Sequence, residues 1–549
     1  MKLKYLLITA LAVMPQLLRA QKKPIGVAQT TLARPKLVVG IVVDQMRWDY
    51  LYRYYDRYQA GGFKRMLNEG FTCENTNIDY LPTETAPGHS CIYTGSVPAI
   101  HGIAANNFYD QQTGRYWYCT EDTTVQSVGT SSKAGVMSPR NLLASTITDE
   151  LRLATNFHSK VIGIALKDRA SILPAGHTPN GAYWFDDASG NFITSSYYMT
   201  DLPAWVKQFN SKKLPESYLS KTWNTLYPID TYTQSTADNM LFEVVSRGDN
   251  APVFPHSFTA HTDYGTIRAT PFGNTLTADF AKAAIDAEHL GSNTATDFLA
   301  ISFSSTDYVG HQYGPNSIEA EDVYLRLDNE LSSLFTYLDA KVGRGNYVAF
   351  LTADHGAAHN ATFALSHNLP AGLWDGTAAA RELNKMLEDK YKIKQAILSV
   401  ENYQVNFNNR EITKSNVSTY AIKQDCINWL AMQPGVMYAV DMQNVQAASI
   451  PAELREHIVN GYNAAHSGAI QVILKPGWYA GRSKSGASHG VSAPYDTHIP
   501  FVLMGWGIQH GSLVRPTHMT DITATVAALL HIQAPSGSIG IPVQEALKK

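Results

Sequence analysis

The sequence predicts an α/β protein with a central, mostly parallel sheet sandwiched by helices. Three continuous apolar, β-branched runs support this prediction, at residues 37–43, 298–303 and 347–353. Runs of this kind indicate strands that are buried on both faces, as in parallel sheets. Between the second and third runs, apolar residues repeat at helical spacing from Tyr324 to Leu338. We therefore expect a strand–helix–strand crossover there, and with it an α/β fold.

Two further apolar runs add strands, and two long segments interrupt the pattern. Residues 161–166 and 497–505 are strand-like, whereas residues 182–297 are rich in aromatic and polar residues with weak periodicity and are interpreted as an insertion. Residues 375–477 predict an inserted α/β cap, with helical patterns at 378–387 and 421–432 and a polar hairpin near Asn408 to Arg410. The main domain is then expected to comprise residues 21–374 and 478–549.

Composition excludes several classes of partner. The chain has 549 residues, enough for a large core, and only 17% of them are charged, with a net charge of −3. This charge balance predicts neither a basic surface of the kind that binds nucleic acid nor an acidic tail. We therefore expect small-molecule partners.

The first twenty residues predict a secretory signal peptide. Lys2 and Lys4 precede an apolar run from residue 5 to 18, and cleavage is expected after Ala20, although the exact bond stays open. The run is too short to predict a transmembrane helix, and an uncleaved anchor is the alternative. We expect a periplasmic protein without a stable membrane anchor. Four cysteines could oxidise there, and three pairings stay open among Cys73, Cys91, Cys119 and Cys426.

Acidic and imidazole side chains follow the three apolar runs at the point where each run ends. The carboxyl ends of parallel strands border the crevice in which open α/β sheets bind ligands. A helix-cap or turn role explains one such residue, but recurrence at three strand ends favours a metal site, and Asp and His are ligands that zinc takes. The residues are Asp44, then Asp307 and His311, then Asp354 and His355, with His489 ahead of the C-terminal strand.

A polar turn at residues 83–90, Thr-Glu-Thr-Ala-Pro-Gly-His-Ser, leads into another apolar segment. Because proline is favoured in the first turn of a helix, Pro87 places Thr85 near a helix N-terminus. Free backbone N–H groups and the helix dipole there favour an anion such as a phosphoryl group. Taken alone, Thr85 or Thr83 is more simply a capping residue. The metal-type residues elsewhere in the chain favour a catalytic role for Thr85.

Together these motifs resemble the alkaline phosphatase superfamily, and in particular its phosphate-irrepressible alkaline phosphatases of Gram-negative bacteria. The resemblance covers nearly the whole chain after the leader. It implies two Zn²⁺ ions at the C-terminal edge of the sheet, and hydrolysis of small phosphate monoesters through a covalent phosphothreonine at Thr85. It further implies one zinc held by Asp44, Thr85, Asp354 and His355, a second held by Asp307, His311 and His489, and phosphoryl contacts from Asn106, Lys167 and Arg169.

Departures from neighbouring families narrow the substrate class. Thr85 cannot become formylglycine, which argues against a sulfatase. A nucleotide pyrophosphatase or phosphodiesterase would share every proposed metal ligand, and the pair Lys167 and Arg169 is what favours a monoesterase. The alternative for that pair is a surface ion pair with Asp168. From another class, a periplasmic metal-binding or carbohydrate-binding protein could use the same strand-end residues without chemistry.

Overall fold

The centre of the fold is a row of five parallel strands, β10 (Tyr347–Thr352), β1 (Leu37–Val43), β9 (Asp297–Phe303), β6 (Val161–Ala165) and β7 (Gly181–Asp186). The computed structural model that contains them describes residues 32–246, 249–258 and 263–548. Every residue of β1, β9 and β10 is buried, because helices cover both faces of the sheet. The predicted mostly parallel sheet is confirmed.

Shorter and antiparallel strands complete this sheet of eleven at its two edges. On one side, β17 (His498–Gly505) runs antiparallel to both β10 and β2 (Phe71–Asn77). The short strands β18 (Gly511–Leu513) and β19 (Thr517–His518) run parallel to β2. On the other side, β8 (Asn191–Ser195) runs antiparallel to both β7 and β5 (Ser127–Val128). Parallel order is therefore confined to the centre and to these short edge pairs.

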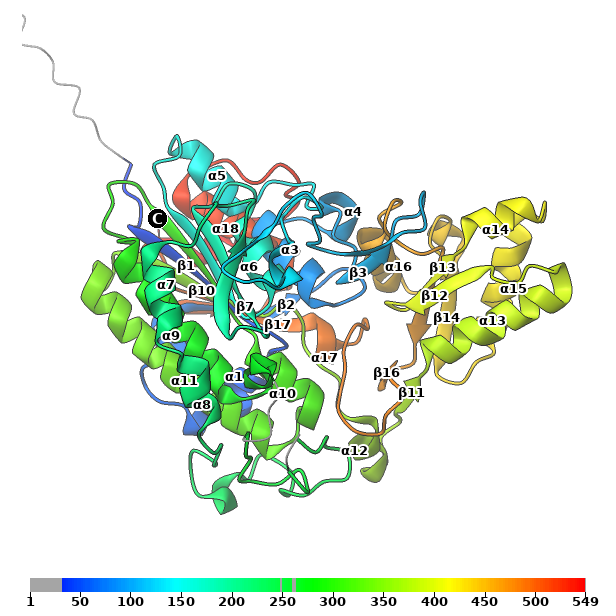
Figure 1. Cartoon of the computed structure of the whole chain (residues 1–549), viewed down its shortest axis with the longest axis horizontal. Helices are drawn as coiled ribbons and strands as arrows, with labels where there is room; N and C mark the ends of the chain where they lie inside the picture. The colour runs from blue at the N-terminus through cyan, green and yellow to red at the C-terminus, as the bar shows by residue number, and fades with distance from the viewer. Residues whose placement is uncertain (1–31, 247–248, 259–262, 549) are drawn as a thin grey trace, which may run out of the picture. The chain divides into compact units, whose positions relative to one another are not determined.

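Two groups of helices sandwich the sheet (Figure 1). One group packs α3 (Thr85–Thr94) against α6 (Asp168–Ala175), α5 (Ile147–Ala154) and α18 (Met519–Leu530). The other group packs α9 (Pro271–Ala287) against α10 (Ser305–Tyr313) and α11 (Ile318–Leu338). The helical pattern predicted from Tyr324 to Leu338 is all but the first six residues of α11. The helix begins where the Ser317 side chain accepts a hydrogen bond from the Ala320 amide. With α10 it forms the predicted crossover from β9 to β10.

A second, four-stranded sheet lies within the segment predicted as a cap. Its order is β12 (Ile397–Glu401), β13 (Gln404–Phe407), β15 (Ile470–Leu474) and β14 (Val436–Asp441), all antiparallel. Helices α13 (Gly376–Tyr391) and α15 (Thr419–Ala431) contribute to a separate hydrophobic core with this sheet. The two predicted helical patterns are therefore confirmed, while the domain boundaries at 375 and 477 stay a prediction.

Two predictions about these segments are wrong in part. Asn408 does not lie in a hairpin: its side chain accepts a hydrogen bond from the Glu411 amide and caps the helix α14 (Asn409–Lys414). The hairpin turn of the cap lies instead at Asn402 and Tyr403, between β12 and β13. The interpretation of residues 182–297 as one insertion is also too broad, because β7 and β8 belong to the central sheet. Nearly every residue of β7 and β8 is buried, so their sequences lack the alternation of apolar and polar residues by which a strand with one exposed face is predicted.

The predicted signal peptide lies outside the described residues. Among the residues that the structure does describe, none of the helices combines the length and apolarity needed to cross a bilayer. Cys73, Cys91, Cys119 and Cys426 are all described, and each is a buried free thiol. No disulfide therefore joins these four residues.

Candidate active site

Asp44, Asp354 and His355 meet at the C-terminal ends of two neighbouring strands. Asp44 directly follows β1, and Asp354 and His355 follow the adjacent parallel strand β10. All three side chains are fully buried. Their ligand atoms lie within 4.8 Å of one another. The parallel register of β1 and β10 therefore builds this acid/imidazole group directly.

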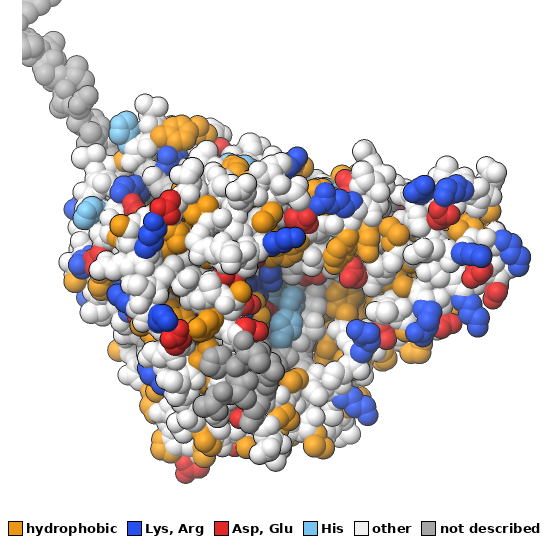
Figure 2. Space-filling model, in the orientation of Figure 1, with side chains coloured by type: hydrophobic (Ala, Val, Ile, Leu, Met, Phe, Trp, Pro, Cys, Tyr) orange, Lys and Arg blue, Asp and Glu red, His pale blue; other side chains and the backbone are white. Residues whose placement is uncertain are grey.

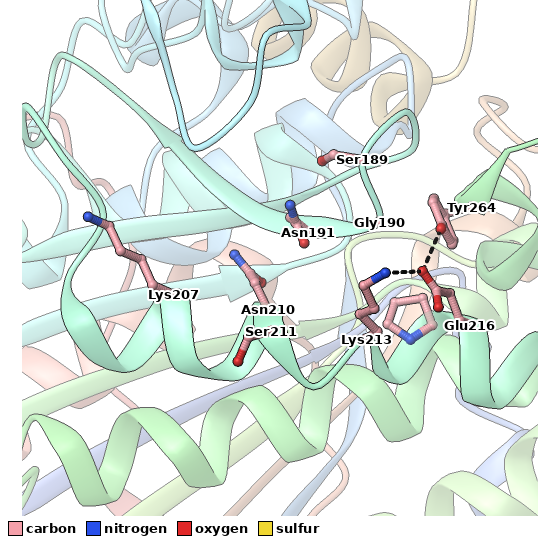
Figure 3. A pocket seen from close by; sticks show the side chains of 10 residues that line it. Ser189, Gly190, Asn191, Lys207, Asn210, Ser211, Lys213, Glu216 and Tyr264 are labelled. Carbon is pink, nitrogen blue, oxygen red and sulfur yellow. Dashed lines mark hydrogen bonds and ion pairs between the residues drawn. The ribbon is translucent and has the colours of Figure 1, made fainter.

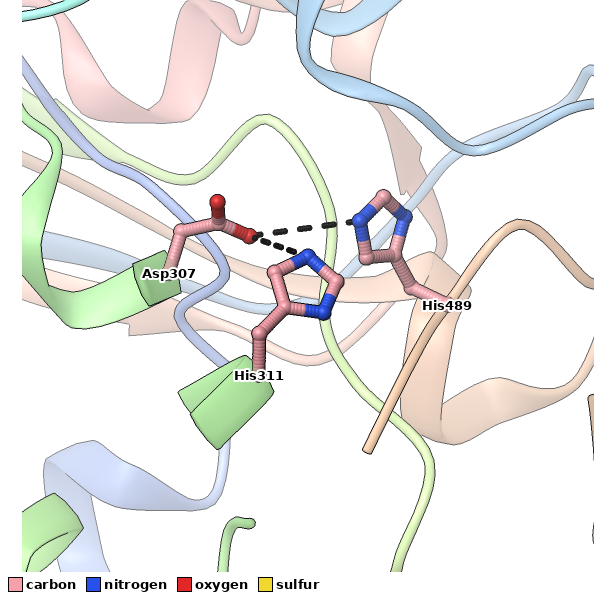
Figure 4. A group of neighbouring side chains, drawn as sticks. All are labelled: Asp307, His311 and His489. Atoms are coloured by element: carbon pink, nitrogen blue, oxygen red, sulfur yellow. Dashed lines mark ion pairs between the residues drawn. The ribbon is translucent and has the colours of Figure 1, made fainter. Parts of the chain in front are cut away.

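Asp307, His311 and His489 form a second group of the same kind. Asp307 and His311 lie one turn apart on α10, which follows β9, the other neighbour of β1. His489 comes from a loop ahead of β17, so it reaches the group only through the tertiary fold. Asp307 Oδ1 lies 3.2 Å from His311 Nε2 and 3.9 Å from His489 Nε2. Both imidazoles face this carboxylate (Figure 4). The space-filling view shows histidine side chains in a hollow of the surface (Figure 2).

The three imidazoles are oriented by backbone carbonyl groups. His355 Nδ1 bonds to the Gly356 oxygen at 2.9 Å, His311 Nδ1 to the Ala487 oxygen at 2.8 Å, and His489 Nδ1 to the Thr83 oxygen at 2.7 Å. Since a carbonyl oxygen only accepts, each Nδ1 carries a proton, and in the neutral imidazole each Nε2 presents a lone pair to its group. Metal-bound histidines are held in this way.

The donor set of both groups fits a metal ion. Within the described residues, Asp44 Oδ1 and His355 Nε2 are buried without a hydrogen-bond partner, a cost that a bound cation would remove. Carboxylate oxygen and imidazole nitrogen together are the ligands preferred by zinc and similar ions. Burial, followed by the neighbouring His355, lowers the pKa of His489, which keeps this imidazole in the neutral form that coordinates metal.

Lys167 joins the two groups. It follows β6, is fully buried, and places Nζ 2.7 Å from Asp44 Oδ2 and 2.6 Å from Asp307 Oδ2. Burial alone would lower the pKa of Lys167, but the charges of Asp307 and Asp44 outweigh it and hold the pKa above its ordinary value. Lys167 is therefore an ammonium group, able to supply charge but not to accept a proton.

Thr85 is the first residue of α3, as its sequence predicts. The residue that caps this helix is Glu84, and no side-chain capping bond is made. The hydroxyl of Thr85 instead accepts a bond of 3.4 Å from Lys167 Nζ. A capping role for Thr85 is therefore wrong, and its hydroxyl lies beside the group that joins both acid/imidazole clusters.

Asn106 bonds to the first turn of α3, and Arg169 bonds to Tyr118. Asn106 Oδ1 accepts a bond of 2.9 Å from the Ala86 amide in the first turn of α3. Arg169 donates from Nη1 to the Tyr118 hydroxyl at 2.9 Å. Asp168 accepts from Tyr118 and Thr120, so the alternative ion pair between Asp168 and its two basic neighbours is not formed.

Two residues of the site were not identified from the sequence. Gln45 donates from its backbone amide to Asp354 at 3.1 Å and from Nε2 to Asp307 at 2.7 Å, and so touches both groups. It does this with a left-handed φ of 63°, a strained conformation of the kind that clusters at functional sites. No local pattern predicts this role. His89, fully buried one turn after Thr85, lies 3.3 Å from Asp354, and its i+4 spacing from Thr85 is a signal that could have found it.

A separate recess of about 370 Å³ lies beside β8 and the helices that follow it (Figure 3). It is lined by polar side chains, and Glu216 accepts from both Lys213 and Tyr264 across it. Neither acid/imidazole group borders this recess. Lys207 pairs with Asp201 outside the recess, and Asn210 bonds to the backbone of Phe192, so these groups already have structural partners.

Comparison with known proteins identifies the class of this protein. Residues 38–498 match the model of the type I phosphodiesterase / nucleotide pyrophosphatase family. The chain belongs to this family, and the resemblance to phosphate-irrepressible alkaline phosphatases within the wider superfamily is confirmed.

Several relatives match over almost their whole length. The calcium-transporting ATPase of Myroides odoratus is 54% identical over 528 residues, which cover 95% of this chain and 96% of the relative. Alkaline phosphatase PhoV of Synechococcus elongatus is 52% identical over 554 residues and 100% of both chains. Alkaline phosphatase PafA of Elizabethkingia meningoseptica is 51% identical over 527 residues, 95% of this chain and 96% of the relative. The crystal structure of PafA covers 94% of this chain and 100% of its own with a TM-score of 0.93 and 50% identity.

Proposed function

We propose that this protein is a metal-dependent alkaline phosphatase that hydrolyses phosphate monoesters. The observation that carries the proposal is the position of Lys167 Nζ, which contacts Asp44, Asp307 and the Thr85 hydroxyl at once. Two acid/imidazole groups and a candidate nucleophile thereby share one small volume at a helix N-terminus. The names of PhoV and PafA support the assignment.

We assign two Zn²⁺ ions to the two groups. Asp44, Asp354 and His355, with Thr85, would hold one, and Asp307, His311 and His489 the other. Bound zinc supplies Lewis acidity and positive charge at the phosphoryl group. The mixed carboxylate and imidazole donors favour zinc over Mg²⁺, which prefers oxygen ligands.

Each site residue has its own role in the proposed reaction. Thr85 Oγ gives up its proton to solvent and attacks phosphorus, the bond to the leaving oxygen breaks, that oxygen takes a proton from water, and the phosphothreonine that forms is then hydrolysed by water to inorganic phosphate and the free Thr85 hydroxyl. The ammonium of Lys167 stabilises charge on the transferred group, as the N-terminus of α3 does. Asn106 and Arg169 supply further donors to the phosphoryl oxygens. We also assign the protein to the periplasm, on the strength of the predicted leader.

The family description keeps a phosphodiesterase as the second candidate. A monoester carries one more non-bridging oxygen than a diester and needs donors for it. Lys167 and Arg169, two residues apart at the start of α6, can supply them. A metal-binding protein without chemistry has no use for a hydroxyl at this position, and we place it last.

A substrate panel on metal-depleted and zinc-loaded protein tests the proposal. EDTA should abolish hydrolysis, and Zn²⁺ should restore it better than Mg²⁺, with monoesters preferred over diesters, ATP and sulfate esters. Asp307→Ala should lower the zinc content measured by elemental analysis, whereas His158→Ala, at an exposed position, should not. Full activity without bound metal, or a preference for diesters, would overturn the proposal.

A further inference from the structure

The turn of the cap hairpin contacts the segments that carry two site residues. Asn402 and Tyr403 form the two-residue turn between β12 and β13, and both have left-handed φ angles, 55° and 60°. Such angles are required in the commonest two-residue hairpin turns, but Tyr is unusual there because its side chain makes the conformation costly. The conformational cost of a left-handed φ at a tyrosine must be offset by contacts that the residue makes elsewhere.

Tyr403 makes that contact with the backbone of His489. The residue is 5% exposed. Its hydroxyl donates to the His489 carbonyl oxygen at 2.8 Å and accepts from the Ala480 amide at 3.0 Å. The ring lies against Gly490, where an added Cβ would come within 2.5 Å of Tyr403 Cε2. The His489 imidazole is fixed separately through the Thr83 carbonyl. The cap thus holds the backbone of this residue, and the main domain holds its ring.

Asn402 makes a second contact, with the residue that follows Asn106. Its Nδ2 donates to the Asn107 carbonyl oxygen at 2.7 Å. Asn107 directly follows Asn106, whose own amide donates to Glu84 at 2.8 Å and whose side chain accepts from Ala86 at the start of α3. The two adjacent turn residues therefore fix the distance between the segment that carries His489 and the segment that carries Asn106.

We propose that the Asn402–Tyr403 turn is a positioning element of the active site, through which the cap holds His489 toward its metal ion and Asn106 toward the phosphoryl group. This assignment rests on the proposed function, which supplies the metal ion at His489 and the phosphoryl group at Asn106. It gives the cap a role in building the site. Neither turn residue touches the reacting atoms, so both act through the residues that they hold.

Two single-group substitutions test the proposal. Tyr403→Phe removes one hydroxyl and keeps the ring against Gly490, and Asn402→Gly removes the amide while tolerating the left-handed turn. Each has a matched control in the cap. Tyr391→Phe removes a hydroxyl that bonds to Asp425, and Asn416→Gly alters an exposed asparagine that also has a left-handed φ, 57°.

The readouts are metal retention and phosphate binding on full-length protein. In Tyr403→Phe, one of two zinc equivalents should be lost at about tenfold lower chelator concentration, as is typical when a group that orients a metal ligand is removed, with the other unchanged. His489→Ala should lose the same equivalent. In Asn402→Gly, inorganic phosphate should bind about five- to tenfold more weakly, which is the loss expected for one neutral hydrogen bond.

Retention and binding equal to those of the two controls would overturn the proposal. If Tyr403→Phe does not fold, phosphate binding by Asn402→Gly tests the positioning role of the turn by itself. The chelator experiment needs no substrate, so it separates this inference from the proposed function. A wild-type protein that hydrolyses no phosphate ester would remove the function and leave the metal result standing.

Discussion

At the scale of single residues, Thr85 is the most exacting test of the mechanism. Thr85→Ala removes the hydroxyl that would form the covalent bond, and we expect at least about a thousandfold loss in kcat/KM. Thr85→Ser keeps the hydroxyl and should retain substantial activity. Acid quenching with a slow, labelled monoester should trap phosphate on the peptide that contains Thr85. Label on another residue would refute the assignment.

Lys167 and Arg169 are the two residues that we expect to set the preference for monoesters over diesters. We expect Lys167→Ala and Arg169→Ala each to cost about 2 to 4 kcal/mol of transition-state stabilisation on a monoester, as other electrostatic deletions do. The loss on a matched diester should be much smaller, because one oxygen fewer needs a donor. The double change should cost less than the sum, since both groups serve one phosphoryl group. Equal losses on both esters would reopen the diesterase assignment.

At the scale of elements, the site depends on how closely α3 approaches the end of β10. Gly88 permits this approach, because an added Cβ would lie 2.4 Å from the Asp354 carbonyl oxygen and 2.7 Å from Asp354 Cβ. Gly88→Ala should therefore displace the helix from Asp354, destabilise the protein by about 1 to 3 kcal/mol and lower zinc content. Ser90→Ala on the same helix adds no atom and serves as the control. Chemical unfolding and elemental analysis measure both effects, and unchanged zinc would contradict the expectation.

The central elements could be predicted because their signals are local. A strand buried on both faces is a nearly continuous apolar run, and such runs predict β1, β9 and β10 from the sequence. The cap hairpin could not be placed, since Tyr403 at a left-handed turn position contradicts local turn preferences and is held by contacts distant in sequence. The same applies to β7 and β8, whose sheet partners are set by the fold.

At the scale of the whole molecule, stability should depend on pH through Glu243. Burial, and then the neighbouring Glu319, raise the pKa of Glu243 from 4.5 to about 9. Between these values the folded protein holds a proton that the unfolded chain has released, so this group lowers the free energy of unfolding as pH rises through that window. Glu243→Gln, which stays neutral, should flatten this fall and be more stable than the wild type near its upper end.

Thermal unfolding of the metal-loaded protein at several pH values within that window measures this effect. Glu388→Gln, at an exposed helical position, is the control and should leave the profile unchanged. A Glu243→Gln profile parallel to that of the wild type would show that Glu243 is ionised in the folded protein.

The sequence alone determined the fold class and nominated five of the seven proposed metal ligands, because each lies within a few residues after an apolar run. His489 precedes its run, and Thr85 was assigned as a ligand through the family resemblance. The sequence could not determine that Lys167 contacts Asp44, Asp307 and Thr85 together, since these lie on separate strands and helices. Gln45, which joins Asp354 to Asp307, and Tyr403, which holds His489, were likewise decided only by tertiary structure. The physical reason is that ligand identity is a property of one side chain, whereas its positioning depends on hydrogen bonds between segments that only folding brings together.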